Sequence, residues 1–311
     1  MNFLAKDKLT DSLAVNILSM TIHNNERLGV NTIQVNEVNE VKSVDSNISK
    51  IKSLSEINVS QPEKTLFLFD IDDTVFDSAH MIGTSGWRKY IGAAAGKIDS
   101  SRNWHDVFSH FLSQKHPLQT AEPNTSQYIT NLQEKGYVVC GLTARERNKW
   151  YDTPQNGVDV MTTKQLNSVG VNFNNRSLED NYPHLSWDSE YFSGTFFADT
   201  DTKGEYLIKL LKGTAEAPKK VVFIDDKKSQ VESVSKALVE LGIEHECYTY
   251  SALEDKPKSF NPLLANIQLY YFYQSNGETV ISDSRAQEIA AENPEKDAEY
   301  YLRATLEIAK K

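Results

Sequence analysis

Cysteine is scarce in this chain of 311 residues, long apolar runs are missing, and basic residues are outnumbered by acidic ones. The two cysteines, Cys140 and Cys247, do not have the spacing of a structural metal site, and a chain of this length does not need disulfides to fold. No segment approaches the ~20 consecutive apolar residues of a membrane-spanning helix. The 43 acidic and 33 basic residues give a formal net charge of -10. This charge argues against nucleic acid or an anionic membrane as the main partner, since both attract basic surfaces.

Targeting and nucleotide-binding signals are missing as well. Residues 1–8 lack the apolar stretch of a secretory signal peptide, so we expect a cytoplasmic protein or one secreted without such a signal. No glycine-rich phosphate loop or dinucleotide fingerprint occurs, and the seven histidines do not have metal-ligand spacing.

Short, almost entirely apolar runs separated by helical patterns dominate the middle of the chain. Such runs are typical of buried parallel strands, and their alternation with helices predicts an α/β fold with a doubly wound, mostly parallel, Rossmann-like sheet. The predicted strands are 65–70, 137–143, 220–225 and 244–250, and the predicted helices between them are 127–135, 162–169 and 203–211. Ser229 and Glu232 form a capping-box pattern that predicts the start of one more helix.

Flanking segments are expected at both ends of this core, which we place at residues 61–255. The N-terminal flank, residues 1–60, is polar and partly ordered, with helices predicted for residues 10–20 and 46–57. The C-terminal extension, residues 256–311, is predicted to be helical at 263–273, 286–291 and 298–309. Its helices either brace the sheet or hold a partner, and bracing is the favoured role.

Polar residues follow the apolar runs at the points where ligands bind in open parallel sheets. Four motifs stand there in order: Asp70-Ile71-Asp72-Asp73-Thr74, Gly141-Leu142-Thr143-Ala144-Arg145, Thr202-Lys203-Gly204-Glu205, and Asp225-Asp226 after Val222-Phe223-Ile224. Taken singly, each has a simpler explanation as a turn, a helix cap or a solvated side chain. Four in register at successive element ends are not explained in that way. Lys212 and Lys219 lie near enough in sequence to leave the choice of Lys203 open.

These motifs resemble those of the haloacid dehalogenase superfamily over roughly residues 64–252. The resemblance implies a phosphoryl-transfer enzyme in which Asp70 is the nucleophile and Asp72 is the general acid and base. Thr143 and Lys203 would hold the phosphoryl oxygens. It also implies Mg²⁺ bound by Asp70, by the main-chain carbonyl of Asp72 and by an acid of the fourth motif. Asp226 is favoured as the direct ligand with Asp225 behind it, and their order stays open.

Substrate choice in this superfamily resides mainly in inserted caps. Residues 79–119 leave room for a small helical cap, in which Trp87 lies either at the site entrance or in the core of the insertion. A small cap favours an open site and a phosphoprotein substrate, with a small metabolite or a nucleotide as the alternative. A phosphotransferase or mutase, or a catalytically weak interaction protein, also fits the motifs. Arg145 is expected either to reach a phosphate or to form a surface ion pair.

A closer resemblance is to a bacterial branch of the superfamily, of unknown function, found in intracellular bacteria. It rests on Gly86-Trp87, Gly141-Leu142-Thr143-Ala144-Arg145, Phe223-Ile224-Asp225-Asp226-Lys227 and Ile281-Ser282-Asp283. That branch implies host or signalling phosphoproteins as substrates, an analogy at the level of the fold.

Overall fold

The computed structural model describes residues 20–23, 32–35, 47–60, 63–113, 115, 117–147, 157–174, 176–214 and 216–310. The chain divides into two units, residues 1–43 and residues 44–311. In the first unit, β1 (Met20–His23) pairs antiparallel with β2 (Thr32–Val35). The helix predicted for residues 10–20 lies outside the described residues except for Met20, which begins β1.

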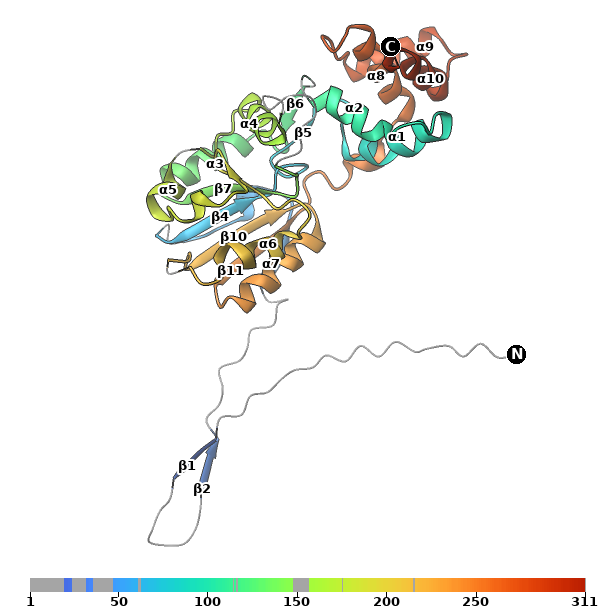
Figure 1. The fold of residues 1–311 in the computed structure, drawn as a ribbon. Coiled ribbons are helices and arrows are strands. Elements are labelled where there is room, and N and C mark those ends of the chain that lie inside the picture. The colour runs from blue at the N-terminus through green and yellow to red at the C-terminus, as the bar shows by residue number, and fades with distance from the viewer. Residues whose placement is uncertain are drawn as a thin grey trace, which may run out of the picture. The chain divides into compact units, whose positions relative to one another are not determined.

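A seven-stranded sheet organises the second unit (Figure 1). Every neighbouring pair in it is parallel except β8 with β9. The strands, in spatial order, are β3 (Ile48–Ile51), β11 (Glu244–Tyr250), β10 (Lys220–Asp225), β4 (Thr65–Phe69), β7 (Val138–Thr143), β9 (Thr195–Phe197) and β8 (Tyr191–Phe192). The predicted α/β fold with a mostly parallel sheet is therefore confirmed.

Both faces of the sheet are covered by helices, which explains why the central strands are apolar throughout. Alternate residues of β4 point to opposite faces, so Leu66 and Leu68 join one apolar cluster and Phe67 and Phe69 join the other. On the first face lie α5 (Ser177–Asn181), α6 (Lys203–Leu211) and α7 (Lys228–Glu240). On the second lie α3 (Thr125–Glu134) and α4 (Val158–Ser168).

Two local predictions are wrong. Residues 46–57, predicted as a helix, form strand β3 and a short 3₁₀ turn, η2 (Leu54–Glu56). The edge of β11 pairs with this segment, Cys247 opposite Ile48, and these tertiary hydrogen bonds override the helical spacing of the apolar residues. The predicted capping box is also not formed, because α7 begins at Lys228 and Glu232 pairs with that lysine instead.

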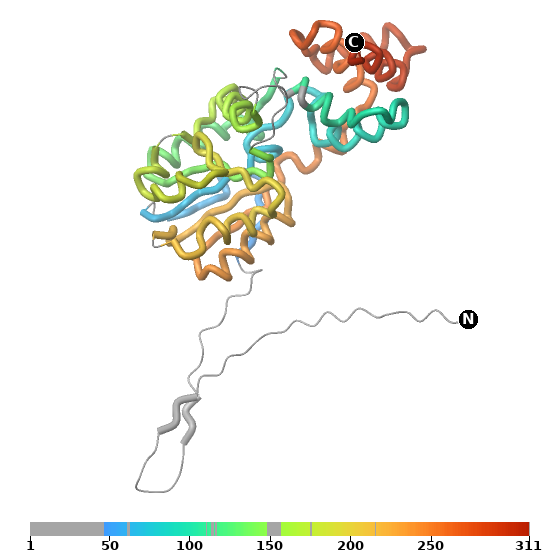
Figure 2. The backbone as a smooth tube through the Cα atoms, viewed as in Figure 1, coloured from blue at the N-terminus to red at the C-terminus, as the bar shows by residue number. Residues whose placement is uncertain are grey.

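The remaining helices pack around two further apolar clusters. In one of them Trp87 and Phe108, from the insertion after β4, are buried with Leu269 and Leu302 of the C-terminal extension. Figure 2 shows the insertion after β4 lying beside the C-terminal segment. The helices are α1 (Ser85–Ile98), α2 (Trp104–Ser113), α8 (Pro262–Gln274), α9 (Asp283–Glu292) and α10 (Ala298–Ala309).

Specific contacts join the insertion to the C-terminal helices. A Cβ on Gly86 would lie 2.7 Å from the Cβ of Phe260, so glycine allows the close approach of the two segments. Asp283 accepts a hydrogen bond from Met81 N at 2.9 Å, and Gln268 accepts one from Ile82 N at 2.9 Å. The C-terminal helices therefore pack on the insertion, and the expectation that they brace the sheet is wrong for the described residues.

The structure also places Trp87 in the core of this helical unit, with 1% of its surface exposed, rather than at a site entrance. Within the described ranges, none of the helices combines the length and the apolarity that crossing a bilayer requires. Two short strands, β5 (Phe76–Ser78) and β6 (Leu118–Thr120), pair antiparallel where the chain leaves and re-enters the sheet domain.

Candidate active site

The strand order reverses at β4, and the predicted site residues lie around the carboxyl end of that strand. From β4 the sheet continues through β7 and β9 on one side, and through β10 and β11 on the other. Asp70 follows β4 directly, Thr143 is the last residue of β7, and Asp225 is the last residue of β10. Ligands bind at such a switch point in open α/β sheets, because the loops on either side diverge there and leave a crevice.

Lys203 joins the first and fourth motifs in the interior. Its ammonium donates hydrogen bonds to Asp70 Oδ1 and, at 2.5 Å, to Asp225 Oδ2. The lysine is 1% exposed. Burial alone would lower the pKa of Lys203, but the charges of Asp70 and Asp225 outweigh burial and raise it. Lys203 is therefore a permanently charged bridge between two strand ends.

The local sequence explains how Lys203 reaches this position. Thr202 and Glu205 form a reciprocal capping box that starts α6 at Lys203. A Cβ on Gly204 would lie 2.2 Å from the carbonyl oxygen of Ser233, so glycine is needed for α6 to pack this closely on α7. The capping box therefore fixes where α6 begins, and Gly204 allows α6 to pack on α7, so that the Lys203 side chain lies in the interior.

Three carboxylates gather beside Lys203. Oxygens of Asp70, Asp225 and Asp226 lie within 4.8 Å of one another, and no other group of this kind occurs in the part of the chain that the structure describes. Thr74 Oγ1 donates to Asp70 Oδ2 at 3.1 Å and accepts from Asp226 N at 3.1 Å. The hydroxyl of Thr74 therefore ties the end of β4 to the end of β10.

The two acids of the fourth motif differ in how their oxygens are used. Asp225 accepts from Lys203 through one oxygen and from Lys227 N, at 2.8 Å, through the other. Asp226 Oδ1 is buried and has no hydrogen-bond partner among the described residues. A buried carboxylate oxygen without a partner is costly unless a cation or a proton reaches it.

Electrostatics at this cluster favour uptake of positive charge. Burial and the neighbouring charge of Asp70 raise the pKa of Asp225 to about 6 and that of Asp226 to about 8. An oxygen-rich, anionic site with a free ligand atom matches the donor set that Mg²⁺ prefers. The residues present therefore fit a divalent cation.

Asp72 is not one of the three clustered carboxylates, and its side chain is bound by Arg145 instead. The guanidinium donates from Nε and Nη2 to the two oxygens of Asp72, each at 2.8 Å. Arg145 Nη1 is in turn held by Thr162 and Gln165, each at 2.7 Å. Burial would raise the pKa of Asp72, but the charge and hydrogen bonds of Arg145 hold it far below its usual range. Of the two roles expected for Arg145, an ion pair forms, but it is partly buried rather than on the surface, and its partner is a predicted site residue.

Thr143 is buried at the end of β7, and its hydroxyl accepts a hydrogen bond from Arg145 N at 3.3 Å. The two predicted residues of the second motif are thus linked to each other. The short distance in sequence between them was the only signal that could have suggested the link, and it did not indicate Asp72 as the partner.

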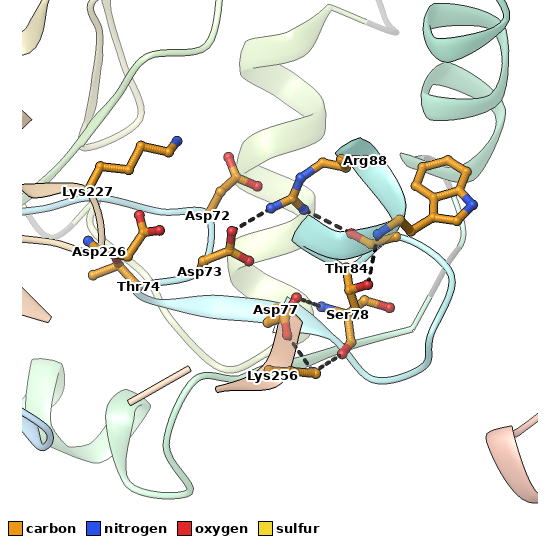
Figure 3. A network of polar contacts seen from close by, with 12 residues as sticks. Asp72, Asp73, Thr74, Asp77, Ser78, Thr84, Arg88, Asp226, Lys227 and Lys256 are labelled. Carbon is orange, nitrogen blue, oxygen red and sulfur yellow. Dashed lines mark hydrogen bonds and ion pairs between the residues drawn. The ribbon is translucent and has the colours of Figure 1, made fainter. Parts of the chain in front are cut away.

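The helical unit also reaches the loop that carries Asp72. Arg88 of α1 donates to Asp73 at 2.6 Å and to the carbonyl oxygen of Gly83 at 2.9 Å. Lys256, at the start of η5 (Lys256–Ser259), forms an ion pair with Asp77 and donates to Ser78 O at 2.8 Å. Figure 3 shows both pairs, with Asp72 and Asp73 between Arg88 on one side and Asp226 and Lys227 on the other. They connect the insertion and the C-terminal segment to the first motif.

The molecule is thus an α/β protein with an acid-rich site at the switch point of a parallel sheet and an attached helical unit. Residues 37–287 match the family described as "Protein of unknown function (DUF2608)", and the chain belongs to that family. The chain is also similar to curated proteins from Chlamydia. The protein of Chlamydia trachomatis serovar D is 24% identical over 208 residues, which are 66% of this chain and 76% of the relative. That of Chlamydia muridarum is 24% identical over 235 residues, 73% and 85% of the two chains. Both carry the name "Putative outer membrane protein".

Proposed function

We propose that this chain is a Mg²⁺-dependent phosphomonoester hydrolase of the haloacid dehalogenase type. One observation carries the proposal: buried Lys203 bridges Asp70 and Asp225 next to the unpartnered oxygen of Asp226. Three sequence-distant segments supply these groups at the switch point of the sheet. Turn and cap chemistry alone does not explain why an ammonium and three carboxylates share one buried place.

The free oxygen of Asp226 supports this acid of the fourth motif, rather than Asp225, as the one that would hold the cation. Asp226 and Asp70, with the main-chain carbonyl of Asp72, would be the ligands. Asp225 would stand behind them, because it accepts hydrogen bonds from Lys203 and from Lys227 N, whereas Asp226 Oδ1 has no partner among the described residues. Bound Mg²⁺ supplies positive charge that offsets the repulsion between the anionic nucleophile and the anionic phosphoryl group. Lys203 contributes a second, fixed positive charge beside Asp70.

Asp70 acts as the nucleophile in this proposal. One of its oxygens forms a bond to phosphorus, and the bond from phosphorus to the ester oxygen breaks, so the alcohol leaves and an aspartyl-phosphate remains. Water then attacks phosphorus and releases inorganic phosphate, which restores the carboxylate. Lys203 and the Thr143 hydroxyl would position the phosphoryl oxygens in both steps.

Asp72 would move the proton in each step, and Arg145 sets how it does so. While Arg145 holds it, Asp72 is an ionised carboxylate, the form that accepts a proton from the attacking water. To protonate the leaving alcohol in the first step, Asp72 must turn away from Arg145 and take up a proton from water, which it then gives to the ester oxygen. We propose that substrate binding between these groups provides this release.

The second candidate is an interaction protein with weak or no catalysis. The ion pair between Arg145 and Asp72 favours it, because Asp72 cannot protonate a leaving alcohol while Arg145 occupies both of its oxygens. Hydrolysis of p-nitrophenyl phosphate with Mg²⁺ separates the two, when wild type is compared with Asp70→Asn. We expect turnover by the wild type that chelation abolishes, and loss of at least about a thousandfold in the variant. No turnover with any phosphoester, or equal turnover in the variant, would sink the hydrolase proposal.

The location of the protein belongs to the same proposal. The relatives are named as putative outer membrane proteins, and export from the cytoplasm agrees with those names better than a purely cytoplasmic role. Fractionation of producing cells, followed by immunoblotting of the cytoplasmic, membrane and medium fractions, tests this directly. Protein recovered only from the cytoplasmic fraction would contradict secretion.

A further inference from the structure

A pocket of about 850 Å³ opens beside Asp226. Its walls are the ends of β3 and β11, the start of α7, helix α1, and the segment from Ser251 to Pro257. Pockets of this size hold small organic ligands. Since the proposed cation ligand lies in its lining, a phosphoester bound at the site would extend its organic part into this pocket.

Cations line the pocket in excess. Three of them are paired with acids of the same lining: Lys50 with Glu254, Arg88 with Asp73, and Lys256 with Asp77. A fourth, Lys228, pairs with Glu232, which lies outside the lining, whereas Lys89 and Lys227 have no acidic partner among the described residues. The only other acid in the lining is Asp226, which the proposed cation would use.

The two unpaired lysines come from different parts of the molecule. Lys227 follows the acid pair at the end of β10, and its positive charge acts on both Asp226 and Asp72. Figure 3 shows its side chain alongside Asp226. Lys89 belongs to α1, one residue after the arginine that binds Asp73. A ligand contacting both lysines would therefore touch the sheet domain and the helical unit together.

We propose that the substrate is a small organic phosphomonoester with a second anionic group, carboxylate or phosphate, that Lys89 and Lys227 bind. This inference rests on the proposed hydrolase function. Lys89 and Lys227 are exposed, and two lysines without acidic partners in one pocket attract an anion more strongly than a neutral organic group. The walls contributed by α1 and residues 251–257 favour a small molecule over a phosphoprotein.

Binding of phosphonates, which have no cleavable ester bond, tests this without relying on turnover. Titration calorimetry with Mg²⁺ present would compare alkylphosphonates with ω-carboxyalkylphosphonates of equal chain length, in a short and a longer series. We expect the carboxylated ligand of at least one length to bind about tenfold more tightly to the wild type. Lys89→Ala and Lys227→Ala should each remove most of this difference.

Matched lysines on the same helices are the controls. Lys97 of α1 and Lys236 of α7 are exposed and outside the pocket lining, so Lys97→Ala and Lys236→Ala should keep the tenfold preference. Equal affinity for both ligand types at every length would overturn the second-anion inference, even if p-nitrophenyl phosphate is hydrolysed. So would a preference that survives both pocket variants, or no binding of either ligand type. A phosphopeptide that binds more tightly than every small ligand would place the substrate among proteins instead.

Discussion

Arg145 donates two hydrogen bonds of 2.8 Å to Asp72, one to each carboxylate oxygen. Thr162 and Gln165 of α4 hold the same guanidinium, so the pair is anchored to the covering helix of the sheet. The acid-base residue of the proposed mechanism is therefore kept ionised and oriented by a neighbour that belongs to the second motif.

Replacing Arg145 should change the pH dependence of hydrolysis. In Arg145→Ala the pKa of Asp72 is expected to rise toward its usual value, since the charge that lowers it is gone. Since Asp72 must be ionised to take a proton from the attacking water, the acidic limb of the rate of aspartyl-phosphate hydrolysis against pH should then move to higher pH. Stability should fall by about 1–3 kcal/mol. Pre-steady-state and steady-state rates across pH provide the measurement.

Arg147→Ala is a suitable control, because Arg147 pairs with Asp159 at 3.4 Å and does not bind Asp72. An acidic limb that stays in place in Arg145→Ala, while the control behaves as wild type, would mean that Asp72 does not carry the proton.

Replacing Asp226 should remove most of the stabilisation of the fold by Mg²⁺. Mg²⁺ should raise the unfolding free energy of the wild type by about 2.7 kcal/mol at a concentration of about a hundred times its Kd. Asp226→Asn should lose most of this gain, because the unpartnered oxygen Oδ1 is the proposed ligand atom. Thermal unfolding with and without Mg²⁺ measures it.

Glu240→Gln, a change on the exposed end of α7, should retain the full Mg²⁺ response. If Asp226→Asn is stabilised by Mg²⁺ as strongly as wild type, the cation does not bind at this cluster.

Stability without Mg²⁺ should fall as the pH rises from about 4 to about 8. The pKa values of Asp225 and Asp226 are raised to about 6 and about 8 in the folded protein, so in this window the native state holds more protons than the unfolded chain. Stability then decreases with pH, by at most about 1.4 kcal/mol per pH unit for each such group. Urea unfolding at several pH values checks the slope.

Added Mg²⁺ should flatten this decline, since it neutralises the same carboxylates, and Asp226→Asn should flatten it without metal. A stability that rises steadily over this pH window in metal-free protein would contradict the raised pKa values.

Lys203→Met should destabilise the fold and stop catalysis. The change keeps an unbranched side chain of similar length but leaves Asp70 and Asp225 buried without their shared cation, at a cost of about 3–5 kcal/mol. Chemical unfolding together with p-nitrophenyl phosphate hydrolysis gives both readouts. Lys212→Met, on the exposed end of the same segment, tests the alternative lysine and should have little effect on either. Near-normal stability in Lys203→Met would show that the buried bridge is unimportant.

Several elements could be predicted from sequence because their signals are local. Strand β10 and helices α6 and α10 have the predicted bounds, since each is defined by an unbroken apolar run or by clear helical spacing. The positions of Asp70, Thr143 and Asp225 at strand ends follow from the same runs.

Contacts between segments that are distant in sequence could not be predicted from local patterns. Residues 48–51 became an edge strand because β11 offered hydrogen bonds to it, and that edge is not visible in the segment itself. Similarly, Gly86 and Phe260 meet because two amphipathic segments bury their apolar faces against each other. The spacing of apolar residues indicates which face of a helix is buried, but it does not indicate which other segment packs against that face.

The sequence by itself determined the alternation of strands and helices and placed the acids and Lys203 at element ends, because apolar periodicity and capping act over a few residues. Only the tertiary structure decided that Lys203 bridges Asp70 and Asp225, that Arg145 binds Asp72, and that one oxygen of Asp226 remains free. Those contacts depend on which buried charges can neutralise one another once the strand ends are brought together, and no local pattern encodes that choice.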